Sequence, residues 1–254
     1  MNKTADVIII GGGIIGLSIA YHLAEQKAGK IIVLERDLLA QASTGLSLGG
    51  IRQQFSHPAN IRLSQASLKV FKEFEQNFGI DINFRQVGYL FLIQQPDTWK
   101  NFLSAVELQK ELGVPVKLLS PNEIKKGWPY INTDGLQGGT FGPADGYADP
   151  YQVAMGYAKA CRKLGVKILE KTEVTDLKVQ NNRIFGVKIS SGSITAPVVV
   201  NAAGAWAAQV GKMAGLDLPV KPYRRQAFMT KSFDRIPKPV PLVIAQHGLG
   251  SYPE

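Results

Sequence analysis

Residues 6–35 read DVIIIGGGIIGLSIAYHLAEQKAGKIIVLE and carry three patterns in a fixed order. Residues 6–10 are a short apolar run, residues 17–27 have the composition of a helix, and residues 30–35 form a second apolar run. Short apolar runs next to glycine-rich turns indicate buried strands. The order strand, glycine turn, helix, strand therefore predicts a βαβ unit, with parallel strands and a right-handed crossover.

Three glycines between the first strand and the helix, Gly11, Gly13 and Gly16, have the spacing G-x-G-x-x-G. In this place they provide a tight turn, room for a pyrophosphate and close helix–strand packing, and the helix start offers free N–H groups to phosphates. Glu35 ends the second strand, where its carboxylate accepts hydrogen bonds from ribose hydroxyls. Arg36 suits a 2′-phosphate, but the adjacent Glu35 repels one, which disfavours NADP. The rival interpretation is a glycine-rich turn and a surface glutamate without a ligand.

The loop at residues 42–52, ASTGLSLGGIR, favours FAD over NAD. An NAD domain normally continues into further plain βα units, whereas this chain inserts a loop rich in glycine and serine. Ser43 and Thr44 place hydroxyl groups within reach of a pyrophosphate. Three glycines of the loop let the backbone lie against a flat ring: Gly45, Gly49 and Gly50. We therefore expect residues 6–35 to hold the ADP half of FAD.

Helical and strand patterns alternate along the rest of the chain. Helices are expected at 59–78, 96–113, 151–165 and 202–215, with a short helical or turn segment at 121–129. Strands are expected at 87–93, three or four times within 166–200, and as candidates at 225–232 and 240–246. Two hairpin turns are expected, at Asn181-Asn182 and Ser191-Gly192. Residues 136–150 have the glycine and proline content of a loop.

Several segments in this order resemble the amino-acid-oxidase-like (DAO) FAD-dependent oxidoreductases, a family that includes sarcosine oxidase, glycine oxidase and dimethylglycine dehydrogenase. The resemblance is greatest to the beta subunits of dye-linked L-proline dehydrogenase and sarcosine oxidase. It is carried by IIGGGIIGLSIAYHLA (9–24), STGLSLGGIRQQF (43–55), VGYLFL (87–92), ADGYADPY (144–151), EVTDL (173–177) and VVVNAAGAWA (198–207). These motifs are specific to the superfamily and not to one substrate. Family members continue well past the position of Glu254, so we expect this chain to be truncated.

The resemblance implies an α/β fold with a Rossmann-like FAD-binding domain and an interleaved, C-terminally incomplete α+β substrate domain on an antiparallel sheet. We expect the FAD-binding domain at 1–85 and 142–220, and the substrate domain at 86–141 and 221–254. Val174 is expected to hold the adenine through its backbone. The expected cofactor-binding residues are Gly11, Gly12, Gly13, Ile14, Ile15, Gly16, Glu35, Arg36, Ser43, Thr44, Gly45, Ser47, Gly49, Gly50, Ile51, Val174, Ala202, Ala203, Gly204 and Trp206.

Arg52 follows the loop expected to face the flavin, and in the family a basic residue near this position can bind the substrate carboxylate. A structural salt bridge is the rival role for Arg52, and an ordinary core position is the rival for Trp206. Three residues of the 144–151 segment border the site in this interpretation: Asp145, Tyr147 and Asp149, the last more simply a helix N-cap. The single cysteine, Cys161, and the three histidines, His22, His57 and His247, are expected to be structural.

The composition is that of a soluble globular protein, with 254 residues, 45% hydrophobic and 19% charged. Its longest apolar runs are too short to span a bilayer, and the N-terminus has no small-residue cleavage site, so we expect a cytoplasmic protein without an integral membrane segment. The net charge of +9 is scattered, without the stripe of basic and aromatic residues typical of nucleic-acid binding. A solvated basic surface is the simpler interpretation, and attraction of an anionic cofactor, substrate or membrane surface is the alternative. No metal site is expected.

Three functions remain open. The first is oxidation of the C–N bond of a small amino acid or secondary amine by hydride transfer to flavin N5, which gives an imine. The second is a flavoenzyme of the same fold that oxidises a hydroxy acid or a polyol phosphate. The third is a truncated FAD-binding subunit that is inactive alone. The expected partner is a small-molecule substrate, and a second subunit or an electron acceptor is a further candidate.

Overall fold

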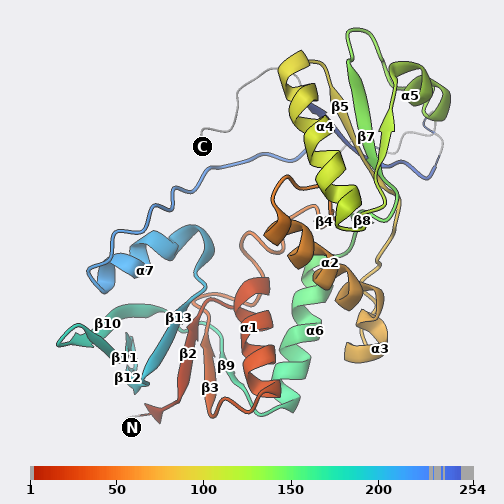
Figure 1. The fold of residues 1–254 in the computed structure, drawn as a ribbon. Helices are drawn as coiled ribbons and strands as arrows, with labels where there is room; N and C mark the ends of the chain where they lie inside the picture. Colours follow the sequence, from red (N-terminus) through yellow and green to blue (C-terminus); the bar gives the residue numbers. More distant parts are fainter. Residues whose placement is uncertain (1–2, 229–230, 232–235, 237, 247–254) are drawn as a thin grey trace. The chain divides into compact units, whose positions relative to one another are not determined.

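The structure, a computed structural model, describes residues 3–228, 231, 236 and 238–246 (Figure 1). The chain divides into two units. Unit 1 comprises Met1–Leu48, Glu75–Ile82 and Asp149–Ala227, and unit 2 comprises Gly49–Phe74, Asn83–Ala148 and Phe228–Glu254. Within the described residues, no helix is long and apolar enough to cross a membrane.

A four-stranded parallel sheet forms the centre of unit 1. Its strand order is β13 (Val198–Asn201), β2 (Val7–Ile10), β3 (Ile31–Leu34) and β9 (Lys167–Leu169). Helix α1 (Ile14–Glu25) connects β2 to the parallel neighbour β3, which confirms the predicted βαβ unit and the α/β fold class. All residues of β2 and β3 are buried, because the sheet is covered on both faces.

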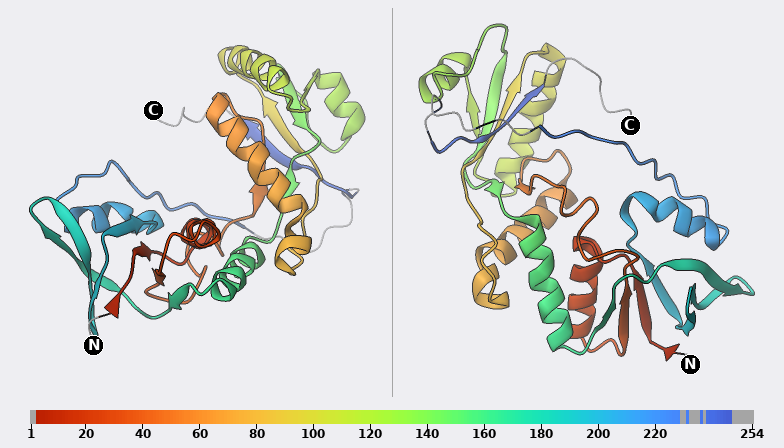
Figure 2. Two further views of the ribbon diagram at one scale, coloured as in Figure 1. Left: turned by 60° about the horizontal axis from the view of Figure 1, so that its bottom comes forward. Right: turned by 180° about the vertical axis from the view of Figure 1, so that it is seen from behind.

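Alternate residues of the strands enter two separate cores. On one face, Ile9 and Val33 pack with Ala20 of α1 and Cys161 of α6 (Pro150–Lys163). Figure 2 shows α1 and α6 side by side on this face. On the other face, Ile8 packs against a second sheet. This sheet has the order β1 (Lys3–Thr4), β12 (Gly192–Thr195), β11 (Arg183–Ile189) and β10 (Val174–Gln180).

The second sheet of unit 1 confirms the hairpin turn predicted at Asn181-Asn182, whereas its other turn lies one residue away from the predicted position. Asn181 and Asn182 both have positive φ, 50° and 58°, and connect β10 to β11. The next turn lies at Ser190-Ser191, one residue earlier than predicted, because Gly192 already pairs with Ile189 at the start of β12. Residues 166–200 form five strands, β9 to β13, rather than three or four. Residues 202–215 form a 3-10 turn, η1 (Gly204–Trp206), followed by α7 (Ala207–Met213).

Unit 2 contains a mixed sheet with the order β14 (Leu242–Gln246), β5 (Tyr89–Ile93), β7 (Gly138–Gly142) and β6 (Lys117–Leu119). Its antiparallel pairs are β5 with β7 and β6 with β7, and β14 runs parallel to β5. Its helices are α2 (Pro58–Lys72), α4 (Pro96–Glu111) and α5 (Pro121–Gly127). The candidate strand at 225–232 is not formed at residues 225–228, and most of its remainder lies outside the described residues.

The prediction of a loop at residues 136–150 is wrong. This segment contains β7 and β8 (Gly146–Tyr147), which pairs with β4 (Gly50–Ile51). The glycines reflect close packing: a β-carbon on Gly138 would lie 2.8 Å from the Trp99 ring, and one on Gly139 would lie 2.9 Å from Ile124 Cδ1. Ladder hydrogen bonds to strands on both sides stabilise β7 despite its low strand propensity.

The helix predicted at 59–78 is two helices, α2 and α3 (Phe74–Phe78), with Glu73 between them. Ile61 of α2 packs with Val106 of α4, together with Val114 and Val116. This contact places residues 49–74 in unit 2, whereas we expected them in the FAD-binding domain.

Candidate functional site

A cavity of about 640 Å³ lies in unit 1 at the carboxyl ends of the parallel strands. Ile10 of β2 and Leu34 of β3 line it, together with Ala202, which follows β13. Strand β2 lies between β3, which follows it in the chain through α1, and β13, which comes much later in the chain, so the strand order reverses at β2. In open α/β sheets, ligands bind in the crevice at such a switch point.

Close backbone packing requires glycine at two positions, Gly11 in the turn between β2 and α1 and Gly16 in the first turn of α1. Gly11 has φ +114°, and a β-carbon there would collide with the carbonyl of Ala202. A β-carbon on Gly16 would collide with the carbonyl of Gly11. Gly13 differs, since a β-carbon there would approach only Thr44 Oγ1, at 3.1 Å. A side chain at Gly13 would instead fill part of the cavity that Gly13 lines.

The N-terminus of α1 opens onto this cavity. The first N–H groups of an α-helix have no acceptor within the helix. One of them, the N–H of Ile14, donates to Thr44 Oγ1 at 3.1 Å, and both Ile15 and Ser43 line the cavity. Backbone donors and hydroxyl groups thus surround a space at the positive end of a helix, which is the chemistry that binds a phosphate.

Glu35 lies at the end of β3 with both carboxylate oxygens held by backbone donors. Oε2 accepts from the N–H of Gly12 at 2.7 Å, and Oε1 accepts from the N–H of Asp37 at 2.9 Å. Each oxygen retains a second lone pair for a ligand hydroxyl. Beside it, the Arg36 guanidinium lies 3.9 Å from the centroid of the Trp206 ring, and its Nε is 3.2 Å from Asp37 Oδ2. Arg36 thus contacts both Trp206 and Asp37 at the cavity wall.

Two further segments complete the cavity wall. The N–H of Thr172 donates to the Glu35 carbonyl at 2.7 Å, which brings Glu173 and Val174 beside the end of β3. The predicted residues that line the cavity are Gly11, Gly13, Ile14, Ile15, Glu35, Arg36, Ser43, Thr44, Ser47, Val174, Ala202, Ala203, Gly204 and Trp206.

Not every predicted cofactor residue lines this cavity. Gly12, Gly16 and Gly45 do not; a β-carbon on Gly45, for example, would meet the Ala40 carbonyl. Gly49, Gly50 and Ile51 belong to unit 2, and their contact with a cofactor stays a prediction.

Residues of α7 and of the loop after β3 line the cavity and were not predicted. Gln209 and Met213 lie four residues apart, so they share one face of α7. A four-residue spacing within a predicted helix can be recognised in the sequence. The other wall residues missed in the sequence carry no recognisable motif: Ile10, Leu34, Asp37, Leu38, Gln41, Ala42, Pro150, Thr172, Glu173, Ala205 and Val210.

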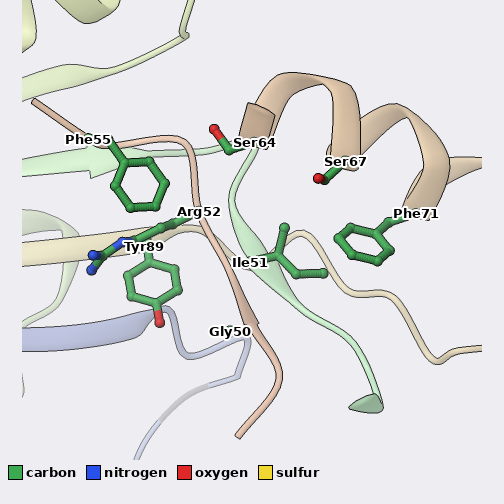
Figure 3. Close-up of a pocket in the computed structure, with 8 residues that line it drawn as sticks. All are labelled: Gly50, Ile51, Arg52, Phe55, Ser64, Ser67, Phe71 and Tyr89. Atoms are coloured by element: carbon green, nitrogen blue, oxygen red, sulfur yellow. The ribbon is translucent and has the colours of Figure 1, made fainter. Parts of the chain in front are cut away.

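Unit 2 has its own pocket, of about 370 Å³, around Arg52 (Figure 3). Figure 3 shows the Arg52 side chain between the rings of Phe55 and Tyr89. The guanidinium carbon lies 4.8 Å from the Phe55 ring centroid and 5.5 Å from that of Phe91. No Asp or Glu in the part of the chain that the structure describes forms an ion pair with Arg52. The other lining residues are Gly50, Ile51, Ser64, Ser67 and Phe71.

The three residues expected at the border of the site do not line either pocket, and their role at a site stays a prediction. Asp145 is buried, and burial raises the pKa of its carboxyl group, although hydrogen bonds from Gln54 and Gln53 oppose this rise. Tyr147 pairs with Gly50 in the β4–β8 ladder. Asp149 is the N-cap of α6, as predicted, and its Oδ1 accepts from two backbone N–H groups at 2.9 and 3.1 Å.

Cys161 and two of the histidines have structural positions. Cys161 is fully buried, and burial raises the pKa of its thiol to about 12. His57 caps α2 by accepting from the N–H of Ala59 at 3.2 Å. His22 Nδ1 lies 3.2 Å from Glu25 Oε2. His247 lies outside the described residues.

Comparison with known families gives one match across nearly all of the chain. The model of the family described as "FAD dependent oxidoreductase" (DAO) matches residues 6–252. Dimethylglycine dehydrogenase of Rattus norvegicus is 32% identical over 233 residues, which are 91% of this chain and 27% of that protein. The FAD-dependent oxidoreductase domain-containing protein 1 of Xenopus laevis is 34% identical over 272 residues, with 89% of this chain and 54% of that protein covered.

A solved structure is also similar. L-proline dehydrogenase from P. horikoshii superposes with a TM-score of 0.77 at 36% sequence identity, covering 85% of this chain and 57% of that chain. The chain thus spans between about a quarter and somewhat more than half of the length of these relatives.

Proposed function

Because the chain belongs to the DAO family of FAD-dependent oxidoreductases, we propose that it binds FAD in the cavity of unit 1 and oxidises the C–N bond of a small amino acid or secondary amine to an imine. FAD is the cofactor of this family. The names of the relatives, dimethylglycine dehydrogenase, sarcosine dehydrogenase and L-proline dehydrogenase, support this class of substrate. The observation that carries the proposal is a glycine-rich helix start and a backbone-anchored glutamate in one cavity.

The cavity residues fit the ADP half of FAD. Glu35 accepts hydrogen bonds from the ribose hydroxyls, and the backbone at Val174 holds the adenine. The first turn of α1 and the hydroxyl of Ser43 bind the pyrophosphate, with Gly13 leaving room for its approach. Ala203 and Gly204 are small where the cofactor passes close to the backbone. Bound FAD supplies the hydride acceptor of the reaction.

Arg52 binds the substrate carboxylate in this proposal. Its guanidinium is half-buried, lies beside aromatic rings and forms no ion pair among the described residues, although its charge interacts with the buried Asp145. A half-buried cation without a direct ion pair favours a role in binding an external anion. An anchored carboxylate fixes the orientation of the neighbouring carbon. The substrate amine must be neutral for its lone pair to assist, so kcat/KM is expected to rise with pH as the amine deprotonates.

The experiment uses the full chain, incubated with FAD and then freed of excess cofactor. Retained visible flavin absorbance that bleaches anaerobically with sarcosine or L-proline supports the proposal. Bleaching with 2-hydroxyglutarate or glycerol 3-phosphate instead identifies the second class of substrate. A yellow protein that none of these bleaches is an FAD-binding subunit inactive alone, and a colourless protein overturns the proposal.

A pair of glycine variants sharpens this experiment. Gly13→Leu fills the cavity while its β-carbon meets only the Thr44 hydroxyl, so the chain is expected to fold and lose FAD. Gly127→Ala is the matched control, because a β-carbon there meets nothing within 4 Å. The cytoplasmic location, the second subunit and the electron acceptor stay predictions.

A further inference from the structure

A buried carboxylate organises the wall of the Arg52 pocket without lining it. Asp145 is 1% exposed, between β7 and β8. Its Oδ1 accepts from the backbone N–H of Gln53 at 2.9 Å, and its Oδ2 accepts from Gln54 Nε2 at 3.0 Å. The peptide group that donates from Gln53 is the one that follows Arg52. The Asp145 carboxylate thus fixes the backbone directly after Arg52, the cationic residue of the pocket.

Gln54 extends this network to a second pocket residue. Its Nε2 also donates to the carbonyl of Tyr89 at 3.0 Å, and its Oε1 accepts from Thr140 Oγ1 at 2.7 Å. Gln54 and Thr140 are both buried. A β-carbon on Gly142 would lie 2.8 Å from Gln54 Nε2, so glycine there leaves room for the pair of side chains. Asp145 is therefore linked to both pocket residues, to the backbone after Arg52 directly and to the backbone of Tyr89 through the Gln54 amide.

A contribution to folding stability does not by itself explain why Asp145 and Gln54 form this buried hydrogen-bond network. Buried charged or polar groups often contribute no more to stability than well-packed apolar residues of the same size, whereas they fix one geometry. Burial raises the pKa of Asp145, while hydrogen bonds from Gln54 and Gln53 and the positive charge of Arg52 favour its ionised form. Here the network fixes the position of residues 52–54 relative to strand β5.

We propose that Asp145 is a positioning residue for carboxylate binding: through Gln53 and Gln54 it holds Arg52 and Tyr89 in the arrangement that binds a small carboxylate. The inference rests on the proposed function, in which Arg52 contacts the substrate carboxylate. Asp145 itself touches no substrate.

The test measures kcat and KM of the FAD-loaded full chain with sarcosine and L-proline, and Ki with acetate as the carboxylate probe. Asp145→Asn is expected to raise KM and Ki about tenfold or more, with a smaller change in kcat, because displaced binding groups lose affinity first. Thr140→Val, which removes one hydrogen bond of Gln54, is expected to change both constants in the same direction by less. Asp134→Asn, an exposed carboxylate of the same unit, is the matched control and is expected to behave as wild type.

A double-mutant cycle separates positioning from general destabilisation. In an Arg52→Met background, Asp145→Asn is expected to change KM and Ki much less than in the wild-type background, because Arg52, the charged one of the two residues that it positions, is gone. Additive effects, or an Asp145→Asn variant with unchanged constants, would overturn the inference while the proposed function stands. If Asp145→Asn does not fold, Thr140→Val is carried through the same cycle. A wild-type chain that oxidises neither amine overturns the proposed function and this inference with it.

Discussion

At the scale of single residues, Glu35 shows how a side chain is prepared for a ligand by its own backbone. Two N–H groups, from Gly12 and Asp37, fix the carboxylate plane at the cavity wall. A charged acceptor forms stronger hydrogen bonds than a neutral one. The orientation is set without a ligand, so in the proposed complex with FAD little entropy would be lost at this side chain.

Glu35→Gln is expected to weaken FAD binding about tenfold or more, because a hydrogen bond to a charged group contributes about 1.5–3 kcal/mol and the amide replaces one acceptor by a donor. Quenching of flavin fluorescence during titration with protein measures the Kd. Glu25→Gln, at the far end of α1 and away from the cavity wall, is the matched control. Equal Kd values for Glu35→Gln and wild type would contradict the role of Glu35.

Cys161 is expected to be inert in the folded protein. With its pKa raised to about 12 by burial, the thiol is almost wholly protonated at pH 8, and only the thiolate is a nucleophile. An aromatic disulfide reagent should release no chromophore from the native chain at pH 8, and one equivalent per chain after addition of guanidinium, since the sequence has one cysteine. Rapid labelling of the native chain would show that the thiol is accessible.

The residues around the cavity of unit 1 could be predicted from the sequence where they belong to a recognisable motif. The glycine spacing, Glu35 and the small residues after β13 all lie at the cavity or beside it. The surroundings of Arg52 were predictable only for Phe55, three residues along the chain, since Tyr89 and Phe91 come from the distant strand β5. Only the folded chain brings them together, and no local pattern records that contact.

At the scale of elements, helix α6 begins at a side-chain cap. The carboxylate of Asp149 accepts from the N–H groups of Tyr151 and Gln152, and Pro150 occupies the first helical position, where no donor is needed. This cap begins the helix that carries Cys161 onto the parallel sheet.

Asp149→Ala is expected to lower the free energy of unfolding by about 1 kcal/mol, the usual cost of losing an N-cap. For a chain of this size the unfolding temperature should fall by about 2–4 °C. Asp149→Asn, which keeps a capping oxygen, should lose much less. Thermal unfolding followed by circular dichroism checks both variants, and an Ala variant as stable as wild type would show that the cap contributes nothing.

Elements with strong periodicity were predicted from the sequence and one glycine-rich strand was not. β2, α1, α4 and α6 have patterns that local physics alone explains. β7 has a weak intrinsic preference for a strand, and its partners β5 and β6 determine its conformation. Such an element depends on long-range pairing, which a local window does not contain.

At the scale of the whole molecule, FAD binding should appear as a gain in stability that depends on the adenosine half. A ligand at 100 times its Kd stabilises the folded state by about 2.7 kcal/mol. FAD is therefore expected to raise the unfolding temperature, and ADP alone should raise it to a smaller extent. FMN, which has no adenosine, is the matched control and should have little effect. Equal shifts with FMN and FAD would place the main contacts outside the cavity of unit 1.

The division of the chain into units was the least predictable property. The change of unit between Leu48 and Gly49 lies within a single loop whose sequence we interpreted as one cofactor-binding segment. Helix α2 is amphipathic in either assignment, and its packing on α4 determines the unit to which it belongs. Such a choice between partners depends on three-dimensional contacts that the order of residues does not specify.

The backbone N–H of Asp149 donates to the carbonyl of Ile82 at 2.8 Å, and this contact bears on how unit 1 can be isolated by internal deletion. The ends of unit 1 on either side of residues 83–148 are already neighbours, so excising that insertion leaves a gap that a few linker residues can bridge. Each unit is assembled from separate stretches of the polypeptide, and simple truncation isolates neither of them. Residues 49–74 are a second insertion of unit 2, so internal deletion of both insertions, rather than a cut at one end, is the route to unit 1 alone.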